Sequence, residues 1–252
     1  MSASTENTTV TPDPASGYSG VEWQSTPFHS FLEHGTFLLF PIMFGLNLHW
    51  ASTTLYELEL LWLLVLAVPL GIVGGDFMSG IVHWAADTYG SDETPVIGPS
   101  LVKPFRLHHL YPKDITTHGL ISLTGNVCIL AVPLLSGTLY LLWLLPGSGL
   151  LAFFVICFAL TSAFTVATNQ FHKWAHQENP PRFARWLQRT RLVLEPNHHQ
   201  QHHTRPFDSN YCITNGWLNP VLNRIRFFRT LESTLLWLFG AETARAKSGG
   251  RY

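Results

Sequence analysis

Residues 126–172 read NVCILAVPLLSGTLYLLWLLPGSGLLAFFVICFALTSAFTVATNQFH and contain no Asp, Glu, Lys or Arg. The central Pro146-Gly147-Ser148-Gly149 is typical of a tight turn. Each half approaches the length of about 20 residues that an α-helix needs to cross a bilayer. A helix pair in a soluble core could be as apolar, but rarely over such a length. The run predicts two transmembrane helices, residues 127–145 and 150–168, joined as a hairpin.

Two more apolar stretches, residues 35–51 and 58–75, raise the expected number of spans to four. Of the 252 residues, 46% are hydrophobic and only 12% are charged, too few to cover a soluble globule. We therefore expect an all-α integral membrane protein whose single domain covers residues 26–240. Residues 1–25, rich in Ser, Thr, Pro and Gly, should form a disordered tail, and residues 241–252 a C-terminal tail.

The basic residues predict the orientation of the spans. All 15 Lys and Arg lie at or after Lys103. The segments that carry them, residues 76–125 and 172–252, should therefore be cytoplasmic, together with both termini. Residues 181–194 and 224–239 have the pattern of amphipathic helices, which either lie in the headgroup layer or pack on the cytoplasmic cap. The net charge of −1 gives no reason to expect nucleic acid.

Histidines gather in four short segments of the expected cytoplasmic face. Residues 196–203 read PNHHQQHH, which places imidazoles at i, i+1, i+4 and i+5 on adjacent stripes of a helical turn. Two i, i+4 pairs follow the second and fourth spans, and a further pair lies in the long loop between spans two and three. The ten expected metal ligands are His83, Asp87, His108, His109, His172, His176, His198, His199, His202 and His203. By contrast, His29, His34 and His49 are scattered.

The ligand types limit the choice of metal. Nitrogen donors with one carboxylate and no usable thiolate fit iron or zinc, and ten donors exceed what one tetrahedral zinc can use. Cys128, Cys157 and Cys212 have no spacing that suggests a disulfide or a zinc ribbon, and we expect them to be reduced. Two ions are implied. A histidine-rich pair of irons in a membrane is suited to activating dioxygen against the unactivated C–H bonds of lipid chains.

Five motifs in this order resemble the Kua/CarF family of membrane lipid desaturases, whose best-known members are plasmanylethanolamine desaturases. They are GDFMSGIVHWAADT (75–88), PFRLHH (104–109), NQFHKWAH (169–176), HHQQHH (198–203) and YCITNGWLN (211–219). The resemblance implies a non-haem di-iron enzyme that uses dioxygen and two electrons. Its reaction would convert the sn-1 alkyl ether of plasmanylethanolamine into the vinyl ether of a plasmalogen. By motif position, the ten residues named above correspond to the iron-site residues of the family. His118, within residues 115–118 (ITTH), also corresponds to one of them.

Other functions stay open beside this one. A plant branch of the same superfamily, with a QHxxHH box and GAWN, acts on an acyl chain of phosphatidylglycerol; the HHQQHH box and Gly216-Trp217-Leu218-Asn219 favour the ether-lipid branch. Residues 117–120 (THGL) and 122–126 (SLTGN) depart from the acidic versions of that branch. A hydroxylase would begin with the same hydrogen abstraction. A metal-ion transporter would need ionisable groups near the bilayer midplane, which these spans lack.

Residues beside the motifs are candidates for substrate contacts. Lys103, Arg106 and Lys113 flank the His108-His109 pair and could bind the lipid phosphate, although positive-inside charge explains them as well. Trp84 and Trp174 could line the path of the chain or anchor the protein at the interface. The sequence contains no flavin or dinucleotide fingerprint. We therefore expect a separate electron donor, cytochrome b5- or ferredoxin-like.

Overall fold

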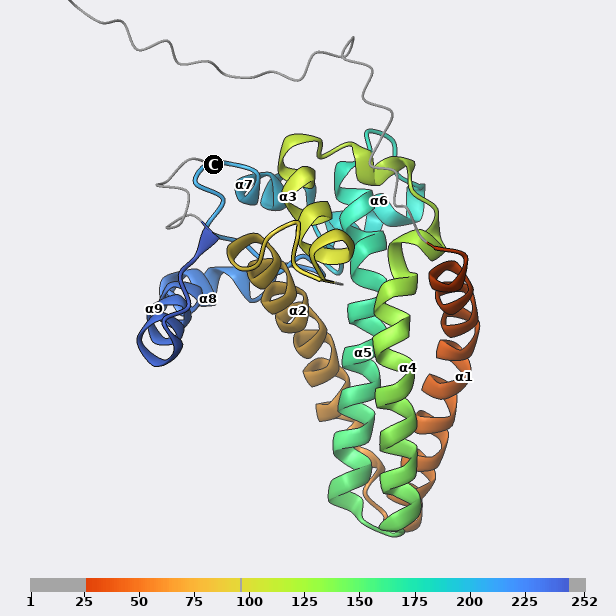
Figure 1. Ribbon diagram of the computed structural model, residues 1–252. Coiled ribbons are helices and arrows are strands. Elements are labelled where there is room, and N and C mark those ends of the chain that lie inside the picture. Colours follow the sequence, from red (N-terminus) through yellow and green to blue (C-terminus); the bar gives the residue numbers. More distant parts are fainter. Residues whose placement is uncertain (1–25, 96, 245–252) are drawn as a thin grey trace, which may run out of the picture.

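The computed structural model describes residues 26–95 and 97–244 (Figure 1). The predicted tail over residues 1–25 and most of the one over 241–252 lie outside the described residues. Within the described ranges the chain is helical and forms no strand. Four of its helices are long and apolar enough to span a membrane: α1 (Pro27–Glu57), α2 (Leu64–Thr88, preceded by a 3-10 turn at Leu61–Leu63), α4 (Leu120–Leu144) and α5 (Gly149–His176). This confirms the all-α membrane architecture with four spans.

The helices extend beyond the apolar stretches that predicted them. α1 continues past both ends of 35–51, and α5 continues from residue 168 to His176. Hydropathy detects only the apolar part of a helix, whereas backbone hydrogen bonds continue into polar sequence. The second span also starts later than predicted, because residues 58–63 form a turn in which Glu59 has a φ of 58°. The extended ends of α2 and α5 are the parts that carry histidines.

α5 is the central helix of the bundle and packs against α1, α2 and α4 (Figure 1). Glycines on α2 allow its backbone to approach α5 closely. A Cβ atom at Gly71 would lie 2.3 Å from Cβ of Leu160, and one at Gly74 would lie 2.3 Å from Oγ1 of Thr161. Any larger residue there would force the two helices apart.

A buried polar contact ties α1 to α4. Asn47 is fully buried, and its Nδ2 donates to the Leu135 carbonyl at 3.0 Å, while Thr138 Oγ1 donates to Asn47 Oδ1 at 2.7 Å. In a hydrocarbon environment a buried amide group needs protein partners, and Asn47 finds two of them on the neighbouring helix. Asn47 therefore sets how α1 sits on α4.

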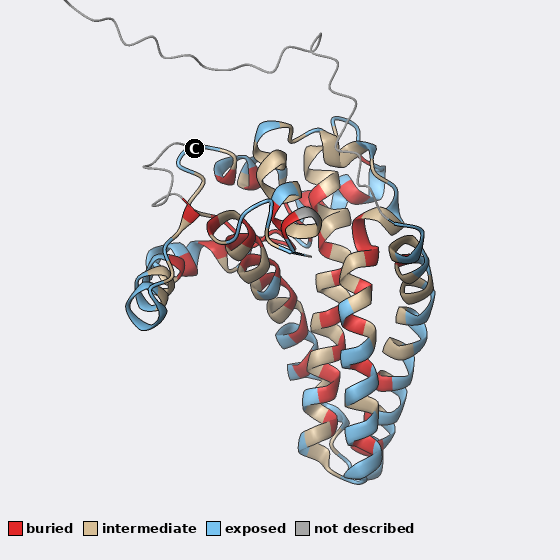
Figure 2. Cartoon of the chain, viewed as in Figure 1, coloured by how far each residue is buried: buried red, intermediate tan, exposed pale blue. Residues whose placement is uncertain are grey.

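Only a minority of the side chains in the four spans are buried inside the bundle (Figure 2). Large apolar residues are strongly exposed on all four helices, among them Leu38, Val65, Leu130 and Leu150. A soluble protein rarely exposes so much contiguous apolar surface. The outer surface of the bundle is therefore suited to lipid, and the chain is a membrane protein.

Shorter helices form a cap at one end of the bundle; the first three lie around the ends of α2 and α5, and the last two lie beside α2 (Figure 1). They are α3 (Lys103–Leu110), α6 (Arg182–Arg189), α7 (Pro196–His202), α8 (Asn219–Arg224) and α9 (Phe227–Phe239), with a π-helical turn at Gly98–Val102 and a 3-10 turn at Asp114–Thr117. Glu195 caps α7 by accepting from the backbone N–H groups of Asn197 and His198 at 3.0 and 2.9 Å. Cys128, Cys157 and Cys212 are free, as expected.

The predicted amphipathic helix over 224–239 is interrupted. Arg226 has a φ of 53°, so α8 ends before it and α9 begins at Phe227. The first part of α9 packs on α2 through Phe228, whereas Trp237 and Phe239 are 82% and 75% exposed. The first turns of α9 therefore pack against the rest of the protein, and its last turns expose an apolar face. In α6, which covers the first part of 181–194, Phe183 and Trp186 are exposed.

Candidate metal centre

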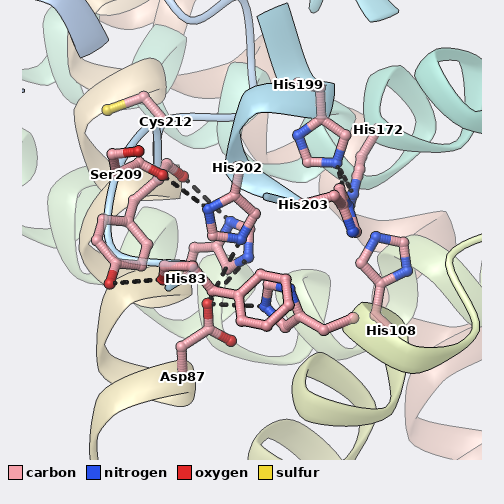
Figure 3. Close-up of polar contacts among 12 residues, drawn as sticks. His83, Asp87, His108, His172, His199, His202, His203, Ser209 and Cys212 are labelled. Carbon is pink, nitrogen blue, oxygen red and sulfur yellow. Dashed lines mark hydrogen bonds and ion pairs between the residues drawn. The ribbon is translucent and has the colours of Figure 1, made fainter. Parts of the chain in front are cut away.

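The cap and the ends of α2 and α5 bring metal-binding side chains together in two adjoining groups (Figure 3). Within each group, one ligand atom from every residue lies within 4.8 Å of the others. Group one is His108, His172, His176, His199 and His203; group two is His83, Asp87, His109 and His202. Nine of the ten ligands expected from the sequence thus lie in these two groups.

The nitrogens of group one converge in a way that hydrogen bonding alone cannot satisfy. His172 Nε2 lies 2.8 Å from His199 Nε2 and 3.2 Å from His176 Nε2, and the nitrogens of His176 and His199 are 2.9 Å apart. A neutral ring nitrogen carries either a hydrogen or a lone pair. Three nitrogens in mutual contact must therefore include at least one pair of like kind, which repel each other. A shared cation removes this conflict because it accepts a lone pair from every ring.

In group two, backbone carbonyls hold two rings in the orientation that a metal requires. His83 Nδ1 lies 3.2 Å from the Tyr211 carbonyl and His202 Nδ1 lies 2.8 Å from the Ser209 carbonyl, so each Nδ1 carries the hydrogen and donates it (Figure 3). The Nε2 lone pairs of His83 and His202 are then directed toward Asp87 Oδ2, at 3.4 and 3.5 Å. Both Nε2 atoms are buried, with no hydrogen-bond partner in the described part of the chain. Metal-bound histidines typically show this N–H to carbonyl contact.

Two pairs of neighbouring histidines are divided between the groups. His108 faces group one and His109 faces group two; His203 and His202 are divided in the same way. Successive residues of a helix point about 100° apart, so one backbone segment can direct one ring to each group. The rings of His109 and His203 are only 5.3 Å apart between centroids, which shows how closely the groups adjoin.

The pKa values of three rings in the metal groups, those of His108, His199 and His202, are lowered by burial. Burial, which disfavours the charged form, is the main cause that lowers the pKa of His108 and of His199 well below the ordinary imidazole value, and repulsion from neighbouring rings adds to it. Burial likewise lowers the pKa of His202 to about 4. A metal binds only the neutral ring, so near pH 7 these nitrogens need not lose a proton first.

His198 does not join the other three histidines of its motif. Its Nε2 accepts a hydrogen bond from Asn219 Nδ2 at 3.0 Å, and among the described residues it belongs to neither group. Around α7, His202, His199 and His203 lie roughly 40°, 100° and 140° from His198. The three histidines that join the metal groups lie on one side of α7, and His198 lies at the edge of that side. Of the four ligands expected from this motif, the structure thus brings three into the two groups.

His118 also lies apart from the two groups. Its Nε2 is 3.0 Å from Asp114 Oδ2, and its carbonyl accepts from Lys173 Nζ at 2.5 Å. These contacts tie the 114–118 segment to α5. Among the described residues His118 belongs to neither group, and the metal ligation that its motif position implies stays a prediction.

The expected phosphate-binding residues take different positions. Arg106 Nη2 donates to the carbonyls of Tyr89 and Gly90, both at 3.1 Å, and so closes the end of α2. Lys113 forms an exposed ion pair with Glu178. Lys103 is exposed at the first position of α3.

Trp84 and Trp174 both pack against aromatic side chains of neighbouring segments. Trp84 is 4% exposed, and its Nε1 donates to Glu232 Oε1 at 3.0 Å, which joins α2 to α9 beside the Phe228 ring. Trp174 packs on Phe171 and Phe183, with ring centroids 5.5 and 5.2 Å away. Trp84 thus lies in a packed core, and a contact between either tryptophan and the lipid chain stays a prediction.

Asp76 is a residue of the site that motif reasoning missed. It is fully buried; Oδ1 accepts from the backbone N–H groups of Asn215 and Gly216 at 3.0 and 2.9 Å, and Oδ2 accepts from that of Leu218 at 3.1 Å. It thereby fixes to α2 the loop that also supplies the Tyr211 and Ser209 carbonyls. The sequence feature that could have identified Asp76 is a carboxylate next to an apolar span, two helical turns before His83 and on the same face of the helix.

The donor set fits two transition-metal ions. Group one offers imidazoles, group two offers three imidazoles and a carboxylate, and the partnerless buried nitrogens described above point inward. Iron and zinc both accept such donors. An all-helical membrane bundle that carries two adjoining histidine-rich groups at one end has the architecture of a membrane-bound metalloenzyme.

The chain belongs to the lipid desaturase family. The lipid desaturase domain matches residues 72–247, the part of the chain that contains both groups. This confirms the family expected from the five motifs. The chain is therefore an oxidoreductase that acts on lipids in a membrane.

Named relatives agree with this assignment. The chain is 43% identical over 197 residues to a plasmanylethanolamine desaturase of Myxococcus xanthus, an overlap of 73% of this chain and 68% of the relative. It is 38% identical over 184 residues to plasmanylethanolamine desaturase 1 of Mus musculus, 71% and 67% of the two chains. It is 33% identical over 177 residues to the chloroplastic fatty acid desaturase 4 of Arabidopsis thaliana, 69% and 52%. No solved structure matches the chain significantly.

Proposed function

We propose that the chain is a plasmanylethanolamine desaturase, which converts the sn-1 alkyl ether of plasmanylethanolamine into the vinyl ether of a plasmalogen. The observation that carries the proposal is the pair of adjoining groups, each with ligand atoms within 4.8 Å, in a chain whose relatives at 43% and 38% identity bear this name. The C–H bonds to be broken are unactivated, so acid–base chemistry by side chains cannot remove their hydrogens.

Two non-haem iron ions are the proposed cofactors, one held by each group. When bound, they supply the means to use dioxygen as an oxidant of a C–H bond. Group one would bind its ion through imidazoles alone, whereas Asp87 adds a negative charge to group two. These donors suit iron and zinc alike, and we propose iron because zinc has no second oxidation state with which to use dioxygen.

The protein's own residues hold and orient the metal-binding histidine rings. The carbonyls of Tyr211 and Ser209 keep the hydrogens of His83 and His202 on Nδ1, so that Nε2 stays available. Asp76 holds the loop that presents these carbonyls. Burial of the rings keeps water away and, with it, competing reactions of the oxidant. Selection of the reacting bond then depends on where the headgroup is bound.

The reaction also needs electrons and protons from elsewhere. Dioxygen takes two hydrogens from the lipid and two electrons with two protons from outside, and leaves as two waters. A cytochrome b5- or ferredoxin-like protein is the proposed donor. We place the metal groups and both termini on the cytoplasmic side, which the distribution of Lys and Arg supports.

Desaturation of an acyl chain on a phosphatidylglycerol-type lipid is the second candidate. The 33% identity to chloroplastic fatty acid desaturase 4 favours it, whereas the higher identity to the two plasmanylethanolamine desaturases favours the ether lipid. Hydroxylation of the same substrate is a third outcome that donor geometry does not distinguish.

Mass spectrometry of ether phospholipids tests the proposal. Cells that express the chain should accumulate plasmanylethanolamine-derived species lighter by two hydrogens and cleavable by mild acid. Species heavier by one oxygen would identify a hydroxylase, and an altered phosphatidylglycerol pool would identify the acyl-chain enzyme. Purified protein should contain iron at about two per chain; stoichiometric zinc without iron contradicts the proposed cofactors.

A further inference from the structure

A hollow of about 290 Å³ opens at the surface beside group one. Its lining comes from two segments far apart in the sequence, the turn around η3 and the residues that follow α5: Lys113, Thr116, His176, Gln177, Glu178 and Asn179. His176 is itself a member of group one. The hollow therefore leads from the surface to a residue of the metal centre.

Opposite charges face each other across the rim of this hollow. Lys113 Nζ lies 2.6 Å from Glu178 Oε1, and the two side chains are 74% and 75% exposed. An ion pair so exposed contributes little to stability, because water screens it and both side chains lose freedom. A ligand can therefore replace the Lys113–Glu178 ion pair with little loss of free energy.

The two walls of the hollow do not depend on that ion pair. Lys173, on α5, donates to the His118 carbonyl, and His118 contacts Asp114. These contacts already fix the 114–118 turn against the end of α5. Lys113 and Glu178 are thus free to separate while the hollow keeps its shape.

A buried acceptor in the lining lacks a donor. Gln177 Oε1 is inaccessible to water and has no hydrogen-bond partner among residues 26–95 and 97–244. A buried acceptor left in this state costs free energy, which a ligand bearing N–H groups would recover once the Gln177 amide turns its oxygen toward the hollow. Gln177 lies between His176 and Glu178 in the chain, next to the negative side of the rim.

We propose that this hollow binds the zwitterionic headgroup of an ethanolamine phospholipid. The phosphate takes the place of Glu178 beside Lys113, and the ammonium binds Glu178 and donates to Gln177 Oε1. The glycerol attached to the phosphate then lies on the His176 side, with its sn-1 ether next to group one. The inference rests on the proposed function and adds to it the residues that select the headgroup.

The same contacts disfavour other headgroups. Choline carries methyl groups in place of N–H donors, so it would leave Gln177 Oε1 unpaired. A phosphoglycerol headgroup has no positive charge for Glu178. A polar site rejects ligands that leave its groups unpaired more strongly than an apolar site rejects a change in size.

Charge variants of the full-length protein test the site. Glu178→Gln should reduce the preference for ethanolamine over choline lipids by roughly tenfold, the order of one charge-assisted hydrogen bond. Lys113→Gln should weaken both lipids alike. The double variant Lys113→Glu with Glu178→Lys keeps an ion pair but reverses its direction, and should bind neither well. Glu93→Gln and Arg189→Gln, exposed residues outside the lining, are the matched controls and should bind like the unmodified chain.

Two readouts separate this inference from the proposed function. The first is retention of ethanolamine, choline and glycerol phospholipids by the purified protein, measured by native mass spectrometry; the second is KM against kcat for desaturation. Wild-type headgroup preference in Glu178→Gln, with wild-type lipid retention in both Lys113 variants, would overturn the headgroup site even if vinyl ethers form. Absence of vinyl ethers in the unmodified chain would overturn the function, while the retention data would still decide whether the hollow binds headgroups. Thermal unfolding of each variant checks that the fold is retained.

Discussion

Replacing His202 with Ala should remove the metal of group two and leave that of group one. His202 supplies one of the four donors of group two and none of the five of group one. Its loss also leaves the Ser209 carbonyl unpaired, at a cost of about 1–3 kcal/mol. We therefore expect iron in the purified protein to fall from about two per chain to about one, with loss of activity.

His198→Ala is the matched control, because it changes the same residue type in the same motif. His198 accepts one hydrogen bond, from Asn219 Nδ2, and Asn219 keeps its other bond to the Cys212 carbonyl at 2.8 Å. Its loss should cost about 0.5–1.5 kcal/mol of folding stability and no iron. Elemental analysis and thermal unfolding in detergent measure both effects.

The two variants together decide whether the histidines are divided as the structure shows. Equal loss of iron from His198→Ala and His202→Ala would refute the placement of His198 outside the metal centre. Loss of both ions from His202→Ala would show that the groups do not bind metal independently.

Three further changes have expected outcomes. Gly74→Ala should destabilise the protein by about 1–3 kcal/mol in thermal unfolding, since its Cβ would meet Thr161 Oγ1 at 2.3 Å, whereas Gly45→Ala, with nothing within 4 Å, should not; equal effects contradict the close α2–α5 contact. Asp76→Asn should cost about 1–3 kcal/mol, because an amide N–H would face the Leu218 N–H, and unchanged stability would remove Asp76 as the anchor of the loop. A chelator should raise hydrogen exchange at residues 196–203 and spare α4; uniform exchange would indicate that metal does not order the cap.

Sequence patterns predicted the features that depend on local geometry. Four apolar stretches identified the spans, and the i, i+4 spacing placed His83 beside Asp87, at 3.4 Å from Nε2 to Oδ2. Both follow from the period and the length of a helix. Both are independent of how the helices pack.

Features that depend on tertiary packing could not be read in this way. Spacing alone gives His198 the same standing as His202, and only the position of α7 against α2 and α5 separates them. Backbone carbonyls such as that of Ser209 have no signature in the sequence. The break at Arg226 and the burial of Trp84 arise from the docking of α9 on α2, which hydropathy does not detect.

The division of neighbouring histidines between the two groups has a consequence for how such a centre can change over time. Because His108-His109 and His202-His203 each send one ring to either side, the separation of the two proposed ions would be tied to the pitch of a helix and not to the placement of whole domains. A shift of α3 or α7 would carry both ions together. Loops around the centre can therefore diversify, and with them the choice of lipid, while the spacing on which oxygen chemistry depends is inherited intact.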